Sequence, residues 1–167
     1  MGSTQEQYQV RSAARRKALQ ILFQSEITGQ DYTRILTEGF CVDEVGVPCD
    51  YTRLLLEGVQ ANCRQIDELI TQISENWSLE RMPLVDRSIL RIATFEMLFV
   101  DEVPYSVSIN EAVELAKRFG GEDESSRFVN GVLGKIAVHL NEGSNNDGND
   151  QRNKAKSRRE KKAVHHG

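Results

Sequence analysis

Residues 85–100 carry apolar side chains on nearly every side of a helical wheel. A helix that is apolar almost all round has to be surrounded by other elements, so this segment predicts a buried central helix. Pro83 suits its entrance, because the N–H that proline lacks has no helical partner there. The run from Asp101 to Pro104 should end it. We therefore expect the rest of the chain to pack as helices around residues 85–100.

Two more helices are predicted after this one. Ser108 and Glu111 have the spacing of a capping box, so the first of the two should begin at Ser108. Gly120 and Gly121 should end it, since glycine enters the left-handed conformation without a steric penalty. The second has a buried face with helical spacing, formed by Val129, Val132, Leu133, Ile136 and Leu140.

Two glycines interrupt the last predicted helix. Gly131 and Gly134 each cost about 1 kcal/mol relative to alanine in a helix interior. Either the backbone packs closely against a neighbouring helix at these positions, or they are tolerated weak points. The sequence leaves both explanations open.

A basic cluster marks the helix predicted from Val10 to Gly29. Arg11 and Arg15 are four residues apart and therefore share a face, and two more cations lie beside them, Arg16 and Lys17. Like charges at this spacing destabilise an isolated helix by about 0.2–0.5 kcal/mol. The cluster either binds a polyanion or simply keeps the helix surface solvated.

The region between the first and the central helix is predicted to hold two helices. Asp31 should cap a short one, and residues 41–49 should form a loop. A long helix should then run from Asp50 to about Trp77, because apolar residues recur every three or four positions along it. This stripe consists of Leu55, Val59, Cys63, Ile66, Ile70, Ile73 and Trp77. Residues 78–82 form a short turn into the central helix.

Four motifs follow one another from the central helix onward: Leu90-Arg91-Ile92-Ala93, Val103-Pro104-Tyr105, the run from Ile109 to Lys117, and the run from Phe128 to Leu133. Their order and spacing resemble those of the NusB transcription antitermination factors, and the resemblance covers residues 10–140. It implies an all-α fold of about seven helices in two packed subdomains. It also implies a protein that binds the boxA element of nascent ribosomal RNA, as a single strand, together with the ribosomal protein NusE.

The resemblance assigns RNA contacts to the first helix. The family's arginine-rich pattern is matched by Arg11, Ala14, Arg15, Ala18, Gln20, Leu22 and Phe23. This implies that Arg11 and Arg15 bind RNA. Family members often carry further basic residues directly after the first arginine, where this chain has Ser12 and Ala13. Two cations one turn later are expected to compensate and to bind RNA, Arg16 and Lys17.

The resemblance also implies roles for residues in the second half of the chain. Phe128 matches a phenylalanine at an interaction surface, and an exposed aromatic there would suit base stacking or partner docking. Arg91 aligns with a phosphate-binding position; its alternative is an ion pair inside the bundle. Asp86 matches an acidic position that contacts NusE; its alternative is to complement the helix dipole. The acidic edge that docks NusE would include Glu124.

The implied function is antitermination, not catalysis. With NusE and RNA, the protein would help RNA polymerase read through terminators and help ribosomal RNA mature. One rival is a module ahead of an RNA methyltransferase domain, but the residues after 141 are too few for a catalytic domain. Another is a self-associating protein whose RNA site is masked in a homodimer, which the uncharged Ser12 and Ala13 would fit. The sequence shows no catalytic pair, cofactor motif or metal-ligand set.

Charge divides the chain into a body and a tail. The net charge is −4, but residues 1–140 carry 14 basic against 21 acidic side chains, a net of −7, and residues 141–167 carry 7 against 4, a net of +3. An acidic body needs a local basic patch to bind RNA. We expect a disordered lead-in at residues 1–9, a domain at 10–141 and a flexible basic tail at 142–167. The tail either raises RNA affinity or only improves solubility.

Cysteine usage and hydropathy predict the compartment. The three cysteines show neither metal-ligand spacing nor a paired framework, which favours reduced thiols in the cytoplasm. No segment approaches the roughly 20 apolar residues that span a bilayer, and the N-terminus lacks the apolar run of a signal peptide. We therefore expect a cytoplasmic protein without a membrane partner.

Overall fold

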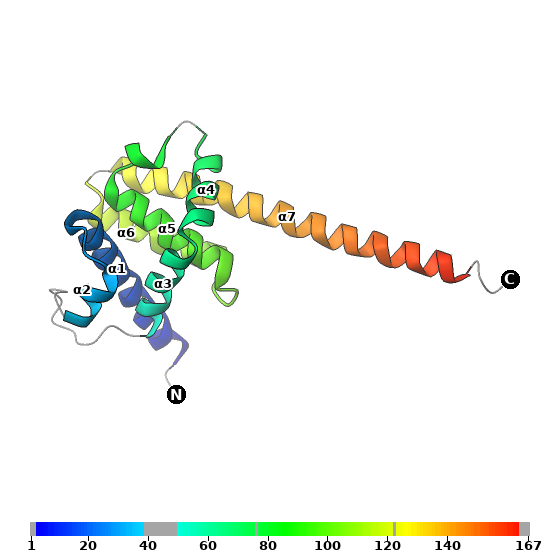
Figure 1. The fold of residues 1–167 in the computed structure, drawn as a ribbon, viewed down its shortest axis with the longest axis horizontal. Helices are drawn as coiled ribbons and strands as arrows, with labels where there is room; N and C mark the ends of the chain where they lie inside the picture. Colours follow the sequence, from blue (N-terminus) through cyan, green and yellow to red (C-terminus); the bar gives the residue numbers. More distant parts are fainter. Residues whose placement is uncertain (1–2, 39–49, 76, 122, 164–167) are drawn as a thin grey trace.

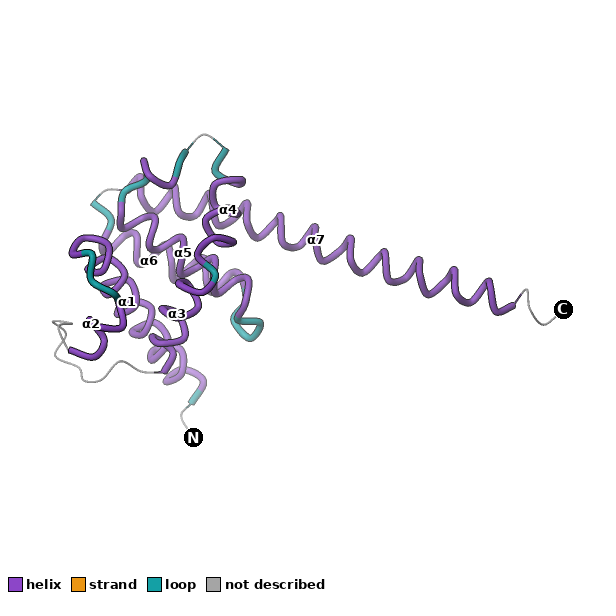
Figure 2. The backbone as a smooth tube through the Cα atoms, in the orientation of Figure 1, coloured by secondary structure: helices purple, strands orange, loops and turns teal. Residues whose placement is uncertain are grey.

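The computed structural model describes residues 3–38, 50–75, 77–121 and 123–163. Within these ranges it is built of helices, with no strand (Figures 1 and 2). The all-α prediction is therefore confirmed. The elements are α1 (Thr4–Thr28), α2 (Tyr32–Glu38), α3 (Asp50–Ala61), α4 (Cys63–Ile73), the 3-10 helix η1 (Leu79–Arg81), α5 (Leu84–Phe99), α6 (Tyr105–Phe119) and α7 (Asp123–Ala163).

Helix α5 lies in the middle of the body, as its all-round apolar surface predicts (Figure 1). It packs against α1, α3, α4, α6 and α7. The core around it is formed by apolar side chains from all of these helices. Because α5 contacts both the N-terminal and the C-terminal helices, it joins the two halves of the bundle into one packed body.

The long helix predicted from Asp50 to Trp77 is wrong in two respects. It divides at Asn62, which has φ −116 and ψ 17 and whose side-chain amide donates to the Gly58 carbonyl at 2.8 Å. The apolar stripe continues across this break because α3 and α4 border the same core. Helix α4 then ends at Ile73, so Trp77 leaves the stripe and is 54% exposed.

The beginning of the chain is helical where a disordered lead-in was expected. Helix α1 starts at Thr4 because Ser3 and Glu6 form a capping box. The Ser3 hydroxyl accepts from the Glu6 N–H at 3.2 Å, and the Glu6 carboxylate accepts from the Ser3 N–H at 3.0 Å. This serine-to-glutamate spacing is visible in the sequence and is the signal that a composition argument overlooks.

The capping box predicted at Ser108 is wrong. Helix α6 starts one turn earlier, at Tyr105, directly after Pro104. Gly120 does end α6, but with an extended φ of −75 instead of a left-handed one. Glycine is required there for space, because an added Cβ would lie 2.7 Å from Cβ of Ser125. Asp31 caps α2 as predicted, accepting from the Thr33 N–H at 2.9 Å.

Helix α7 continues to Ala163 and projects away from the body (Figure 1). The linker expected to be non-helical therefore continues a helix, which gains one backbone hydrogen bond for each residue added to it. The boundary between body and tail at residue 141 stays a prediction. No atom lies within 4 Å of a Cβ added at Gly131 or Gly134, so close packing does not explain these glycines.

The loop predicted at residues 41–49 lies outside the residues that the structure describes. Among the helices that are described, none combines the length and hydrophobicity that crossing a membrane requires.

Candidate nucleic-acid and protein interface

The four cations of α1 do not share one surface. Arg15 is only 2% exposed, so the RNA-binding role predicted for it is not supported by its position. Arg11 and Arg15 lie on the same face of α1, but this face is partly exposed at Arg11 and buried at Arg15. Arg16 and Lys17 are partly exposed, as is Arg11. The candidate RNA-facing cations of α1 are therefore Arg11, Arg16 and Lys17.

Arg15 belongs to a buried polar network that joins four helices. Its Nε donates to Glu96 at 2.8 Å, and its Nη1 lies 3.7 Å from the Glu111 carboxylate. Glu96 also accepts from the hydroxyl of Ser108 at 2.6 Å and from the hydroxyl of Tyr51. Burial and the bond to Glu96 raise the pKa of Tyr51, which keeps this phenol protonated. Ser108 and Glu111 thus fasten α6 to the core instead of capping it.

Arg11 lies at the edge of this network, in contact with both an acid and an aromatic ring. Its Nη2 pairs with Glu102 at 3.2 Å, and its guanidinium lies 4.9 Å from the centre of the Tyr51 ring. The Glu102 side chain is largely exposed, so the pair is weak and screened by salt. An RNA phosphate can replace Glu102 as the partner of Arg11.

Arg91 forms the intramolecular ion pairs that were the alternative to phosphate binding. Its Nε and Nη2 donate to the two carboxylate oxygens of Asp67 at 2.9 and 3.0 Å. Its Nη1 donates to Glu26 at 3.0 Å. A planar guanidinium in this bidentate geometry is held firmly, so Arg91 fastens α5 to α1 and α4.

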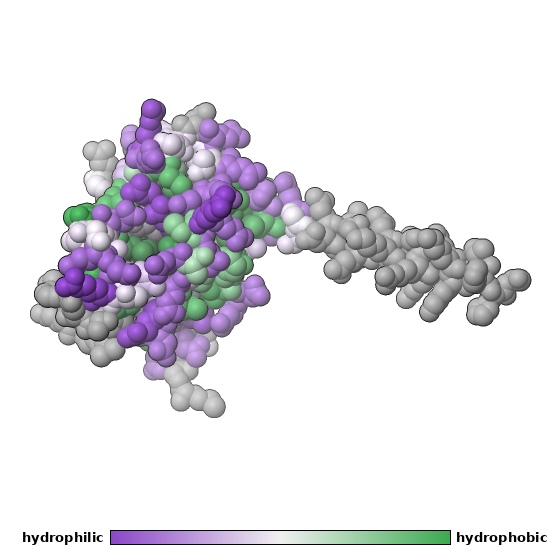
Figure 3. Space-filling view, in the orientation of Figure 1, coloured by the Kyte–Doolittle hydropathy of each residue, from purple (hydrophilic) through white to green (hydrophobic). Residues whose placement is uncertain are grey.

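A groove of about 550 Å³ lies between the beginning of α5 and the beginning of α7. We call it the α5/α7 groove. Trp77 and Phe128 lie side by side in its wall, with ring centres 5.9 Å apart and planes inclined by 60°. Its other lining residues include Phe23, Val85, Asp86, Phe119, Gly120 and Glu124. Figure 3 shows hydrophobic surface among hydrophilic side chains on the face of the body in view.

Asp86 is a buried acid without a cationic partner among the described residues. It is 3% exposed; one oxygen accepts from the Ser125 hydroxyl at 3.2 Å, and the other, Oδ1, has no hydrogen-bond partner. Burial raises the pKa of Asp86, and the bond from Ser125 only partly opposes this. An unpaired buried acceptor costs stability. The lining of the α5/α7 groove therefore includes a buried carboxylate with one unpaired oxygen.

The stability of the protein should reveal this cost through its pH dependence. A folded-state pKa above the unfolded value means that Asp86 favours folding below the unfolded pKa, and that this contribution is lost as pH rises through the folded pKa. Asp86→Asn should therefore match the wild type near pH 3 and exceed its melting temperature at neutral pH. Thermal melts at both pH values measure this difference.

The exposed acid Asp123, at the start of α7, offers the matched control. Asp123→Asn should gain no stability over the wild type as pH rises. If Asp86→Asn is less stable than the wild type at neutral pH, then the Asp86 carboxylate has a stabilising partner and the assignment of a strained acid is wrong.

Several residues of this region were not singled out by the sequence. Trp77 was assigned to the core, and Tyr51 and Glu96 were not considered for a site. Glu96 could not have been found from spacing, because its partner Arg15 is 81 residues away in the chain. Phe128 and Glu124 do line the α5/α7 groove beside Asp86, so the structure brings together the three residues assigned to partner binding.

The chain is similar to known proteins over most of its length. A family model described as the NusB family matches residues 12–138. Transcription antitermination protein NusB of Pelotomaculum thermopropionicum is 47% identical over 129 residues, covering 75% of this chain and 88% of the relative. The structure of T. maritima NusB has a TM-score of 0.68 and 40% identity, covering 77% of this chain and 90% of that chain. A chain in the crystal structure of antitermination factors NusB and NusE in complex with dsRNA has a TM-score of 0.63 and 23% identity. The match covers 77% of this chain and 96% of that chain.

Proposed function

Because the chain belongs to the NusB family of transcription antitermination proteins, which are not enzymes, we propose that it binds boxA-type single-stranded RNA jointly with NusE. The resulting complex acts with RNA polymerase on ribosomal RNA transcripts in the cytoplasm. There it supports read-through of terminators and maturation of the ribosomal RNA.

The observation that carries this proposal is the composition of the α5/α7 groove. Asp86 offers an unpaired buried carboxylate oxygen, which suits an N–H or cationic donor from a protein partner. The exposed acid Glu124 lies at the same groove and adds negative charge. In this proposal, basic residues of NusE bind the acidic edge that Asp86 and Glu124 form.

The aromatic wall of the α5/α7 groove supports a contribution to RNA binding. Trp77 is more than half exposed although it is large and apolar, and its ring packs against the ring of Phe128. A base that stacks on an aromatic side chain gains about 1–3 kcal/mol. Phe128 therefore lies where both the protein partner and the RNA can contact it.

Joint binding follows from the weak basic surface of the protein alone. Arg15 and Arg91 are engaged by carboxylates inside the body, and RNA must displace Glu102 from Arg11. RNA affinity without a partner should then be low. A protein that holds the same RNA adds its own contacts, so each protein strengthens the binding of the other.

Binding of a boxA strand and a scrambled strand, with and without NusE, tests the proposal. Wild type should prefer the boxA strand, and NusE should increase this preference. Phe128→Ala should weaken the joint complex by about 10-fold or more, which corresponds to the loss of one stacked base. Titrations by fluorescence anisotropy at two salt concentrations measure these affinities.

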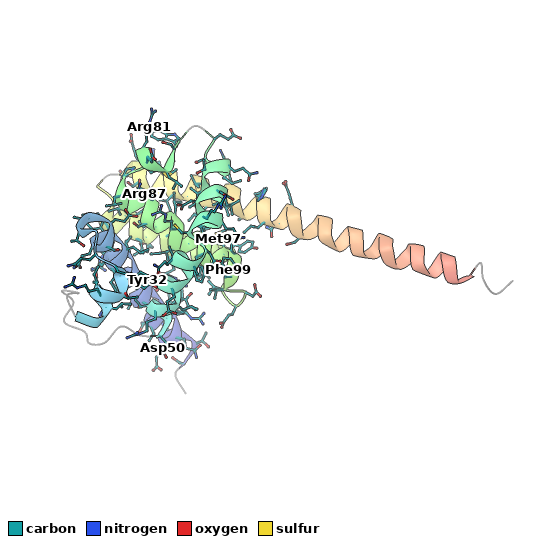
Figure 4. All side chains as sticks on the ribbon, in the orientation of Figure 1. Tyr32, Asp50, Arg81, Arg87, Met97 and Phe99 are labelled. Atoms are coloured by element: carbon teal, nitrogen blue, oxygen red, sulfur yellow. The ribbon has the colours of Figure 1, made fainter. Side chains whose placement is uncertain are left out.

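Phe99 provides the matched aromatic control. It is exposed at the end of α5 opposite to the one where Arg87 lies, and thus lies away from the groove (Figure 4). Phe99→Ala should leave the joint complex unchanged. Equal binding of both strands by the wild type, with no effect of NusE, would contradict the proposed function.

Self-association is the second candidate, and one observation favours it. The large apolar side chains of Val10 and Leu54 are exposed beside Arg11, where they line a shallow surface groove. A second copy of the chain could cover them and mask Arg11. A mass in solution that rises with protein concentration, and falls when RNA is added, would favour this candidate.

A further inference from the structure

A second groove, of about 540 Å³, follows the seam between α1 and α6. We call it the α1/α6 groove. Its walls carry Tyr8, Ser12 and Arg16 from α1, and Glu111, Glu114 and Arg118 from α6. Neither the groove nor Arg118 has a role in the function proposed above.

The two acids of the α1/α6 groove already have partners. Glu111 accepts from the Ser12 hydroxyl at 2.9 Å and lies 3.7 Å from buried Arg15. Glu114 pairs with Lys117 at 3.4 Å. Arg15 is shared with Glu96 and the Glu114 pair is exposed, so these partners offset only part of the negative charge of the two acids.

The two arginines of the groove are not balanced in this way. Within the described residues, neither Arg16 nor Arg118 has a carboxylate within ion-pair distance. Arg118 lies 5.4 Å from the centre of the Phe119 ring, a contact that leaves its N–H donors available. Two guanidinium groups that line one groove and form no ion pair with its acids favour an anionic ligand, and their fork of donors matches a phosphate.

An aromatic side chain at the same groove favours an anion that carries bases. Tyr8 is 49% exposed and lines the groove from the first turns of α1. The Glu111 carboxylate raises the pKa of the Tyr8 hydroxyl, which therefore stays protonated beside it. A half-exposed aromatic ring suits stacking of an unpaired base.

The α1/α6 groove and the α5/α7 groove are lined by nearby residues of α1 and α6. On α6, Arg118 lines the α1/α6 groove, whereas the next residue, Phe119, lines the α5/α7 groove. On α1, Arg16 lines the α1/α6 groove, whereas Phe23, about two turns later, lines the α5/α7 groove. A strand that leaves the aromatic wall of the α5/α7 groove therefore has Arg16 and Arg118 on nearby turns of α1 and α6.

We infer that the α1/α6 groove binds the single-stranded RNA that flanks boxA, with phosphates held by Arg16 and Arg118 and a base against Tyr8. The inference rests on the proposed function, because the flanking strand arrives only if boxA is bound. It also explains how the chain manages without basic residues at Ser12 and Ala13. The cations that face RNA come from the next turn of α1 and from α6.

The test compares a boxA core strand with strands extended by a few uridines on either side. Wild type with NusE should bind one of the extended strands more tightly than the core. Arg16→Ala/Arg118→Ala should lose this gain. Arg118→Ala alone, which alters no residue assigned to boxA binding, should lose part of the gain and keep its affinity for the core. The slope of log K against log salt for the double variant on the extended strand should become shallower by about 0.7 for each lost phosphate contact.

Arg53→Ala/Arg64→Ala is the control, because it removes two positive charges from exposed positions on α3 and α4. It should retain the gain from the flanking nucleotides. Thermal melts confirm that both double variants fold. A gain that survives in Arg16→Ala/Arg118→Ala overturns this inference alone. Failure of the wild type to prefer even the boxA core overturns the proposed function, and this inference with it.

Discussion

Replacing Arg15 with alanine should lower the free energy of unfolding by about 3–5 kcal/mol, the usual cost of breaking a buried ion pair from one side. The Glu96 carboxylate is 1% exposed and would keep only hydroxyl donors, from Ser108 and Tyr51. Glu111 would lose the guanidinium that lies 3.7 Å from its carboxylate. Urea unfolding followed by circular dichroism measures the change.

Two variants separate this effect from a general sensitivity of α1. Arg16→Ala changes the next residue, which is partly exposed and forms no ion pair among the described residues, and should shift stability by no more than about 0.5 kcal/mol. Glu96→Gln removes the charge that Arg15→Ala leaves unpaired, so Arg15→Ala should cost less in that background. Equal costs in both backgrounds would show that the ion pair does not carry the effect.

RNA binding by α1 has to be tested with variants that keep Arg15. A variant that removes Arg11 and Arg15 together would lose RNA binding through unfolding. Arg11→Ala alone, or Arg16→Ala with Arg118→Ala, changes side chains at the surface. Only such variants distinguish an RNA contact from a structural role.

Gly58→Ala should destabilise the protein by about 1–3 kcal/mol, the usual range for an overpacked core. A Cβ added at Gly58 would overlap the ring of Phe95. Phe95 is buried on α5 and stacks against Phe99, so its ring cannot move aside without disturbing the contact between α3 and α5. Urea unfolding measures the loss of stability.

Gly131→Ala is the matched substitution in an open position. No atom lies near a Cβ added there, so alanine should stabilise α7 by up to about 1 kcal/mol through its higher helix propensity. The two glycines therefore predict changes of opposite sign for the same chemical substitution. A stable Gly58→Ala protein would mean that α3 lies farther from α5 than in the structure.

The sequence by itself determined the helical class and the position of the central helix. A wheel that is apolar all round allows only burial, so residues 85–100 could be placed before any contact was known. The family motifs are also local, and the resemblance that they carry predicted partner-binding roles for Asp86, Glu124 and Phe128, which the fold brings to one groove. Local hydrogen-bonding rules account for the ends of helices, including the Ser3 capping box that composition concealed.

Only the tertiary structure decided which charged side chains face solvent. Arg15 and Arg16 are neighbours of the same type, yet one pairs with buried Glu96 and the other lines an open groove. The helical period gives their directions, but the acids that receive Arg15 come from α5 and α6, far along the chain. The same holds for Ser108 and Glu111, whose spacing matches a cap but whose partners lie across the core. A buried charge is stable only beside its partner, and that partner is placed by the packing of distant helices.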